Sequence, residues 1–182
     1  MEEILLSIDK KRSVAVVERE QDTILREPTE EDGQAIWLLI KETGVLDLNS
    51  SYSYLMWSKF FGETSVVVES NGQIVGFISG FIQPNDQNTL FIWQVAVDTS
   101  QRGKGLASRM LQAILHRDTC RNIRCLEATV SPSNKASQAL FRKLSRDLKA
   151  KCHVSEFFTE DQFPGKGHEE ELLFKIGPFH QV

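Results

Sequence analysis

The chain of 182 residues is long enough for one domain with a sizeable hydrophobic core. Apolar and aromatic residues make up 41% and charged residues 25%, a balance that excludes a disordered or fibrous protein. The net charge of −4 argues against a nucleic-acid partner, and no apolar run approaches the roughly 20 residues of a membrane-spanning helix.

The cysteine and histidine residues narrow the class of protein further. The three cysteines form no Cys-x-x-Cys pair, and their odd number argues against a disulfide framework. The first residues, Met1-Glu-Glu-Ile-Leu-Leu, lack the basic segment of a secretory signal, so we predict a cytoplasmic protein with reduced thiols. The four histidines show no metal-ligand spacing, and no metal site is predicted.

Hydrophobic periodicity and turn residues predict alternating strands and helices after residue 22. Residues 1–22 hold one short apolar run and are treated as an N-terminal extension without assigned chemistry. We expect strands at 23–27, 64–69, 73–82, 89–97, 123–130, 152–158 and 170–176. We expect helices between Thr29 and Gly44, at 50–61, at 104–116 and from Asn134 to Leu148.

The connections between these elements predict the topology. Asn71-Gly72 is a strong hairpin signal, and a turn at 84–88 extends the hairpin to three antiparallel strands. The helix at 104–116 lets strand 123–130 lie parallel to the strand that ends at Val97. We therefore predict an α/β (α+β) fold, with one mixed sheet flanked by helices on both faces, as a single domain over residues 23–182.

The most informative stretch, residues 93–107, leads from a strand through a glycine-rich turn into a helix. Unpaired N–H groups at the helix start, together with the helix dipole, suit a phosphate. Gly103 and Gly105 let an anion approach the backbone, while Arg102 and Lys104 add positive charge. The turn lacks the third glycine of a dinucleotide fingerprint and the Gly-Lys-Ser/Thr of a P-loop. An ordinary strand-to-helix turn would also explain two glycines.

The order Arg-x-x-Gly-x-Ala in this turn resembles the acyl-CoA diphosphate loop of the GNAT acetyltransferase superfamily. Arg102, Gly105 and Ala107 match that loop. In the superfamily, the strand corresponding to residues 95–97 diverges from the next strand, and its free backbone groups bind the pantetheine arm and polarise the acetyl carbonyl. The resemblance implies the GNAT fold and acetyl-CoA as co-substrate.

A second motif, Ser131-Pro-Ser-Asn134, is similar to the superfamily segment in which an asparagine contacts the cofactor. Asn134 also suits a helix cap, and the two roles are compatible. The resemblance places twelve residues at the cofactor: Val95, Ala96, Val97, Arg102, Gly103, Lys104, Gly105, Leu106, Ala107, Asn134, Ser137 and Phe141.

A closer resemblance, to the diaminobutyrate acetyltransferase family of ectoine biosynthesis, rests on five separated motifs, at 25–29, 46–52, 91–97, 126–134 and 167–174. It implies transfer of the acetyl group of acetyl-CoA to the γ-amine of L-2,4-diaminobutyrate. The product, N4-acetyl-L-2,4-diaminobutyrate, serves the synthesis of an osmoprotective compatible solute. The resemblance also implies a homodimer, which the composition neither supports nor opposes.

Selecting the γ-amine over the α-amine requires side chains that anchor the α-amino acid end. Asp47, Asn49 and Tyr52 cluster between the first two helices, where the superfamily often forms the acceptor wall. We predict that Asp47 binds an ammonium group and that Asn49 and Tyr52 position the substrate. A helix cap at Asn49 and a solvated charge at Asp47 are the structural alternatives.

Five more residues are candidates for the acceptor side. Trp93 lies two residues before the cofactor strand and is either a site wall or a core residue. Glu127 lies in mid-strand, where a buried acid with a raised pKa could act as general base; the alternative is a polar residue on a half-covered strand. His168 titrates near neutrality and is a second base candidate. Glu169 and Glu170 either bind the cationic substrate or are merely solvated.

The general acid is a departure from the superfamily. Many GNAT enzymes place a tyrosine as general acid near the start of the fourth helix. This chain has Phe141 at the corresponding position, and phenylalanine cannot donate a proton. Either Tyr52 supplies the proton, or the thiolate leaves with help from water and the helix dipole. The predicted catalytic residues are Glu127, Tyr52 and His168. Acetylation of a polyamine, another small amine or a protein terminus, and a catalytically silent acyl-CoA sensor, stay open as alternatives.

Overall fold

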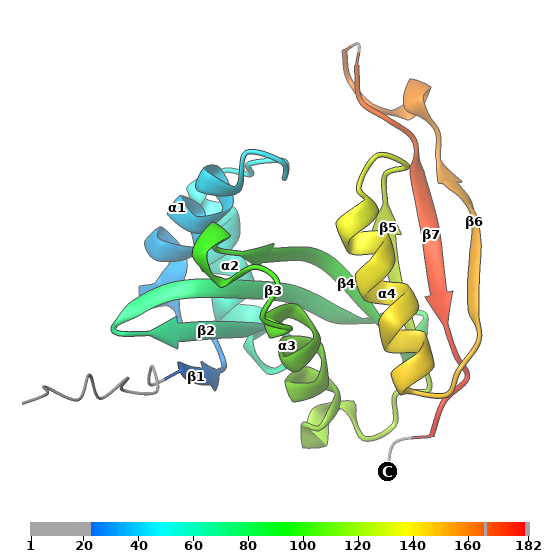
Figure 1. Cartoon of the computed structure of the whole chain (residues 1–182), viewed down its shortest axis with the longest axis horizontal. Helices are drawn as coiled ribbons and strands as arrows, with labels where there is room; N and C mark the ends of the chain where they lie inside the picture. Colours follow the sequence, from blue (N-terminus) through cyan, green and yellow to red (C-terminus); the bar gives the residue numbers. More distant parts are fainter. Residues whose placement is uncertain (1–22, 166, 181–182) are drawn as a thin grey trace, which may run out of the picture.

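The computed structural model describes residues 23–165 and 167–180, which form a seven-stranded sheet with the order β1-β2-β3-β4-β5-β7-β6 (Figure 1). The strands are Thr23–Arg26 (β1), Val66–Ser70 (β2), Gln73–Gln83 (β3), Asp86–Val97 (β4), Cys125–Val130 (β5), Cys152–Phe158 (β6) and Glu171–Ile176 (β7). The helices are Gly33–Thr43 (α1), Ser51–Phe60 (α2), Leu106–Leu115 (α3) and Lys135–Asp147 (α4). The predicted order of elements is confirmed.

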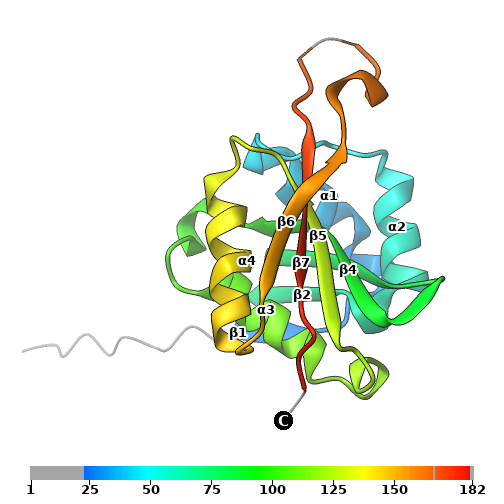
Figure 2. The same ribbon diagram turned by 90° about the vertical axis from the view of Figure 1, so that its right-hand side faces the viewer.

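Neighbouring strands run antiparallel except β4 and β5, which are parallel. The parallel pair follows from the crossover through α3, since a tight turn can join only antiparallel strands. Helices α1 and α2 lie over one face of the sheet, and α3 and α4 over the other (Figures 1 and 2). The predicted mixed sheet with helices on both faces is confirmed.

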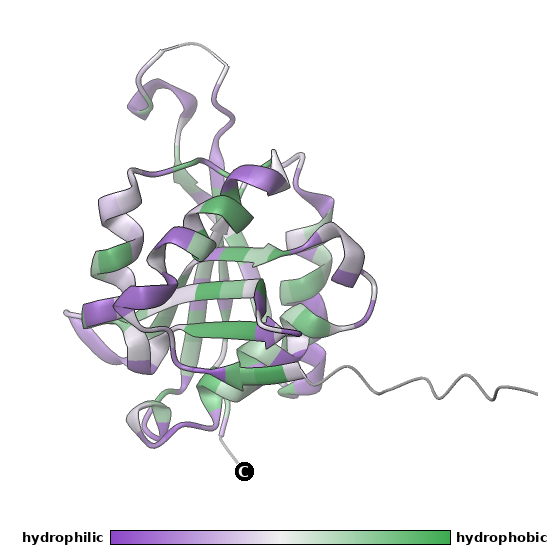
Figure 3. Cartoon of the chain, turned by 90° about the vertical axis from the view of Figure 1, so that its left-hand side faces the viewer, coloured by the Kyte–Doolittle hydropathy of each residue, from purple (hydrophilic) through white to green (hydrophobic). Residues whose placement is uncertain are grey.

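Each face of the sheet has its own hydrophobic core. Met110 and Ile114, four residues apart on α3, are fully buried against one face, and Ile36, Ile40 and Tyr54 are fully buried against the other. Burying each such side chain contributes about 1.5–3 kcal/mol to folding. Figure 3 shows hydrophobic residues along the central strands and hydrophilic ones on the turns.

The turns explain where the strands begin and end. Asn71 and Gly72 both have positive φ, 52° and 74°, as the predicted two-residue hairpin turn requires. The next turn is shorter than predicted, because Pro84 and Asn85 alone connect β3 to β4. Strand β4 therefore begins at Asp86 and not at residue 89.

A β-bulge in β4 changes the direction of its last side chains. The register between β3 and β4 shifts so that Trp93 is an extra residue between Ile92 and Gln94. In a regular strand of the same sequence, Ile92 and Ala96 would face the same side, because side chains alternate along a strand. Instead Ile92 belongs to the core under α3 and α4, and Ala96 to the core under α1 and α2.

Beyond the bulge, β4 and β5 separate. Their pairing ends at Ile92 and Ala128, although both strands continue. Residues 93–97 of β4 therefore have β3 as neighbour on one side and no strand partner in β5 on the other. The divergence predicted for this strand is confirmed and leaves a row of backbone groups facing the gap (Figure 1).

The predicted extension, residues 1–22, lies outside the described residues. The helices of residues 23–180 that the structure describes are too short and too polar to cross a bilayer.

Candidate active site

Two cavities meet where β4 and β5 diverge. One, of about 820 Å³, lies around the glycine-rich turn and is called the glycine-turn cavity. The other, of about 880 Å³, is lined by three acids, Asp47, Glu169 and Glu171, and is called the acidic cavity. They share the lining residues Val45, Leu46, Val95, Ser131, Ser133, Asn134 and Ser137. A molecule that passes through the gap can therefore contact both.

The glycine-rich turn presents an open anion site. Gly103 and Gly105 have φ of 76° and 73°, a left-handed backbone that glycine adopts without steric cost. A Cβ at either position would meet nothing within 4 Å, so the backbone faces open space. Helix α3 then begins at Leu106 without an acidic residue in its first turn, and its free N–H groups suit a phosphate.

The charges of the two cavities differ in sign. Arg102, Lys135 and Lys143 line the glycine-turn cavity, and no Asp or Glu of the described residues does. Lys104, by contrast, lies outside this lining, with its Nζ 3.1 Å from Gln101 Oε1. Lys135 and Lys143 were not predicted, because lysines on a helix are most often solvated.

The start of α4 closes the other side of the gap. Asn134 Oδ1 accepts a hydrogen bond of 3.0 Å from the Ser137 amide, so the predicted helix cap is confirmed. Ser137 lines both cavities. Phe141, one turn further, lines the acidic cavity and packs against Phe174 with ring centroids 6.3 Å apart. The remaining predicted cofactor residues, Val95, Ala96, Val97, Leu106 and Ala107, line the glycine-turn cavity.

The acidic cavity brings Asp47 and His168 together from positions 121 residues apart. His168 Nε2 lies 3.4 Å from Asp47 Oδ2, and its Nδ1 lies 2.6 Å from the Glu169 carbonyl oxygen. The hydrogen bond to that carbonyl, and then Asp47, raise the pKa of His168. The imidazole also stacks on Phe163 at 3.6 Å between centroids. His168 is therefore suited to carry a positive charge.

Glu171, at the start of β7, is the one acid of the sheet that lines the acidic cavity among the described residues. Burial raises its pKa, while His168 and a hydrogen bond from the Thr129 hydroxyl act in the opposite direction. A half-buried carboxylate with a raised pKa is suited to proton transfer near neutral pH. Glu169 accepts hydrogen bonds from the Ser133 hydroxyl and, at 2.9 Å, from the Ser133 amide, which in that order lower the pKa of Glu169.

Comparisons with known proteins agree with this geometry. The chain matches the acetyltransferase (GNAT) family model over residues 22–145. It is 64% identical over 176 residues to L-2,4-diaminobutyric acid acetyltransferase of Sporosarcina pasteurii, with 96% of this chain and 98% of that protein covered. The enzyme of the same description from Marinococcus halophilus is 58% identical, with 86% and 90% covered.

The chain belongs to the diaminobutyrate acetyltransferase family, as predicted. A solved structure of the diaminobutyrate acetyltransferase from Paenibacillus lautus, in complex with its substrate L-2,4-diaminobutyric acid and coenzyme A, has the same fold. Its TM-score is 0.86 at 42% identity, with 89% of this chain and 98% of that chain covered.

Three predicted residues of this family member lie outside the acidic cavity. Glu127 is buried and accepts hydrogen bonds from Gln83 Nε2 at 2.6 Å and Lys175 Nζ at 2.7 Å. Both of its carboxylate oxygens are therefore occupied by donors of the sheet, and its side chain does not line the acidic cavity. Tyr52 is 66% exposed on α2, and Glu170 is absent from the cavity lining to which Glu169 and Glu171 belong. Neither position supports a direct role in the chemistry.

Trp93, Asn49 and Glu169 do line the acidic cavity. Trp93, the bulged residue, stacks on Trp57 with centroids 4.8 Å apart and leaves part of its ring exposed. The backbone N–H of Asn49 donates to the Tyr54 hydroxyl at 3.3 Å, which fastens the chain before α2. The cap of α2 is Ser50 and not Asn49.

Strand alternation could have found Glu171. Phe174 and Ile176 are buried under α4, so residues 171, 173 and 175 point to the opposite face, where the acidic cavity lies. Glu170 is out of phase with that set. The sequence contains the signal, but only once the start of β7 is known.

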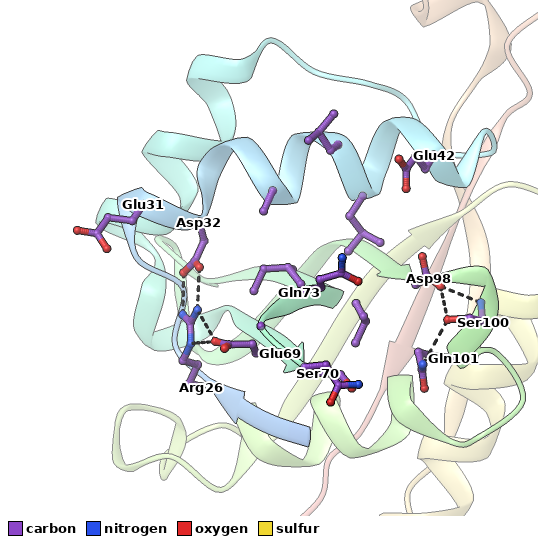
Figure 4. A pocket seen from close by; sticks show the side chains of 17 residues that line it. Arg26, Glu31, Asp32, Glu42, Glu69, Ser70, Gln73, Asp98, Ser100 and Gln101 are labelled. Atoms are coloured by element: carbon purple, nitrogen blue, oxygen red, sulfur yellow. Dashed lines mark hydrogen bonds and ion pairs between the residues drawn. The ribbon is translucent and has the colours of Figure 1, made fainter. Parts of the chain in front are cut away.

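A third cavity, of about 650 Å³, lies between α1, the β2–β3 turn and the β4–α3 connection (Figure 4). Arg26 bridges Asp32 at 2.7 Å and Glu69 at 3.1 Å in it, an arrangement that fastens β1 to its neighbours. None of the predicted site residues lines it. Within the described residues, no group of three His, Cys, Asp or Glu side chains is placed to hold a metal ion.

Proposed function

We propose that this protein transfers the acetyl group of acetyl-CoA to the γ-amine of L-2,4-diaminobutyrate, as an enzyme of ectoine biosynthesis. One observation carries the proposal: a cavity lined by three cations and no acid opens into one that contains Asp47, Glu169 and Glu171. The first suits the anionic coenzyme and the second a substrate with two ammonium groups. Membership of the diaminobutyrate acetyltransferase family supports the same reaction.

The coenzyme would bind mainly to backbone. The N–H groups from Gly103 to Ala107 would hold the diphosphate, with Arg102 adding charge. The pantetheine arm would run along the free edge of β4 and past Asn134 at the start of α4. A backbone N–H on this edge would then stabilise the oxyanion that develops on the acetyl group.

The diamine would bind mainly to side chains. Asp47 and Glu171 offer carboxylates to its two amino groups, and the exposed face of Trp93 offers a ring to a cation. His168, held positive by its neighbours, would attract the α-carboxylate. Opposite charges at the two ends of the substrate fix its direction, which is what selection of the γ-amine requires.

Glu171 would act as the general base. Its carboxylate takes a proton from the γ-ammonium, and the resulting amine attacks the thioester carbonyl. The two tyrosines of the chain are Tyr52, which lies outside both cavities, and Tyr54, which is buried. The proton on the nitrogen of the tetrahedral intermediate therefore moves to the sulfur as the C–S bond breaks. The products are the amide and free coenzyme A, and Glu171 returns its proton to water.

The protein would act as a homodimer. Helix α2 carries exposed apolar side chains on its outer side, namely Tyr52, Leu55, Met56 and Phe60, followed by Phe61. A contiguous apolar surface of this kind is typical of an interface between subunits. Sedimentation equilibrium should give twice the chain mass, and Phe60→Asp should shift it to the monomer. A monomeric wild-type protein would refute the dimer.

The decisive experiment is a turnover screen. The purified protein is incubated with acetyl-CoA and each of a set of small diamines, polyamines and peptide N-termini, and free thiol is measured. We expect the highest kcat/KM with L-2,4-diaminobutyrate, and NMR of the product should place the acetyl group on the γ-nitrogen. Preference for a polyamine would replace the proposed substrate. Binding of acetyl-CoA without turnover of any amine would indicate a sensor.

A further inference from the structure

We propose that Gln94 is a positioning residue for the acceptor, acting through Asp47; this rests on the function proposed above. Gln94 follows the bulged residue of β4, is 6% exposed and lines the acidic cavity. Its Nε2 donates a hydrogen bond of 2.9 Å to the backbone carbonyl of Asp47. This bond joins the centre of the sheet to the α1–α2 loop, residues 44–50.

The chemistry of the bond fixes the orientation of the amide. A backbone carbonyl can only accept, so the nitrogen of Gln94 must be the atom that faces Asp47. The oxygen Oε1 then points elsewhere, and it is buried without a hydrogen-bond partner. A buried unpaired oxygen destabilises a fold. An apolar side chain would therefore fill this position better than the Gln94 amide. What the amide adds is the hydrogen bond that it donates to the Asp47 carbonyl.

The α1–α2 loop needs such an anchor because it has little apolar packing of its own. Val45 and Leu48 are largely exposed, and Leu46 alone packs against the core under α1 and α2. The Asp47 side chain is 85% exposed, with His168 as its contact across the cavity. Without the bond from Gln94, the Asp47 backbone would be held beside the sheet only through its flanking residues, by the packing of Leu46 and the hydrogen bond from the Asn49 amide to the Tyr54 hydroxyl.

The bulge is what makes this anchor possible. The extra residue Trp93 reverses the phase of β4 after Ile92, so that Gln94, like Ala96, points toward α1 and the loop after it. The same bulge exposes Trp93 to the acidic cavity. One backbone irregularity thus sets two walls of the acceptor site, the tryptophan ring directly and the Asp47 carboxylate through Gln94.

The test compares Gln94→Met with the wild type. Methionine has a similar volume but cannot donate, so the loop loses its anchor while the core stays filled. We expect kcat/KM for diaminobutyrate to fall on the order of tenfold to a hundredfold, mainly through KM, as a misplacement of about 1 Å would cause. We expect the Kd of acetyl-CoA to be unchanged and Tm to move by less than about 3 °C, because a buried unpaired oxygen is also removed.

Two further variants make the result specific. Gln94→Glu keeps the shape, but an ionised carboxylate cannot donate, so the loss should match that of Gln94→Met. Ser58→Ala removes another buried oxygen without a partner, on α2 and away from both cavities, and should leave KM unchanged. Wild-type KM in Gln94→Met, or an equal loss of acetyl-CoA affinity, would overturn the proposal.

Failure of the proposed substrate is seen separately, in the wild-type protein. If it acetylates a different amine, the same comparison is made with that amine. If it acetylates none, hydrogen exchange of residues 45–49 decides the matter. Faster exchange in Gln94→Met than in the wild type supports the anchor, and equal exchange refutes it.

Discussion

The glycine-turn cavity and the acidic cavity recognise their ligands through different parts of the chain. The first is built from two short segments, the turn after β4 and the start of α4, and it uses backbone N–H groups and helix ends. The second draws side chains from the α1–α2 loop, β4, β5 and the β6–β7 loop, which only the folded sheet brings together. The coenzyme site therefore depends on local backbone conformation, and the acceptor site on tertiary packing.

Because of this difference, we expect single substitutions to affect either amine binding and turnover or coenzyme affinity, but not both. A side-chain change in the acidic cavity should alter turnover or amine binding and leave coenzyme affinity unchanged. A backbone change in the glycine-rich turn should do the reverse.

The largest effect is expected at Glu171. Glu171→Gln removes the proposed base, and general-base catalysis contributes about 10²–10⁴-fold, so kcat should fall by that range. In the wild type, kcat/KM should fall as pH drops through the raised pKa of Glu171, because only the ionised form accepts a proton. Steady-state kinetics across pH would show this limb, and the variant should lack it. Glu170→Gln, one residue away and outside the cavity, is the matched control and should keep wild-type rates.

Asp47→Ala should weaken the acceptor but not the coenzyme. Losing a hydrogen bond to a charged group costs about 2 kcal/mol, which is on the order of a 30-fold rise in KM for diaminobutyrate. In the same variant, NMR titration should show a lower pKa for His168, because Asp47 helps to raise it. The pKa should stay above the usual value, since the bond to the Glu169 carbonyl remains. Equal losses of diaminobutyrate and acetyl-CoA binding would contradict the division between the cavities.

Gly105→Ala tests the backbone site. A side chain at φ of 73° costs about 1 kcal/mol of strain, which should weaken acetyl-CoA binding by about fivefold and leave KM for the amine unchanged. Isothermal titration would measure the Kd. Gly72→Ala carries the same strain at φ of 74°, with equally open space, in the β2–β3 turn. It should lower Tm without changing the Kd; weakened binding there would point to a general loss of stability.

The smallest effect is expected at Tyr52. Tyr52→Phe removes a hydroxyl that lies outside both cavities and keeps the aromatic ring proposed to face the partner subunit, so kcat should change by less than about twofold. A loss of ten times or more, measured by stopped-flow turnover, would restore Tyr52 as a source of the proton for the thiolate.

The two cavities also differ in how far the sequence could predict them. The residues of the glycine-rich turn reveal its conformation, because Gly103 and Gly105 suit positive φ and Asn134 is a typical helix cap. The acidic cavity has no such local signature. Glu127 and Glu171 are both strand acids, and only their partners distinguish them: Lys175 and Gln83 hold the first, while the second faces the cavity.

The register shift at Trp93 separates two kinds of mutation that a sequence comparison would treat alike. Replacing the tryptophan would alter one ring and leave the bulge intact. Deleting it would remove the bulge and let β3 and β4 pair in regular register, with Gln94, Val95 and Ala96 on the faces they already occupy. The acidic cavity would then lose both the ring and the local bend of β4, so a one-residue deletion there should damage the amine site more than any replacement of the ring.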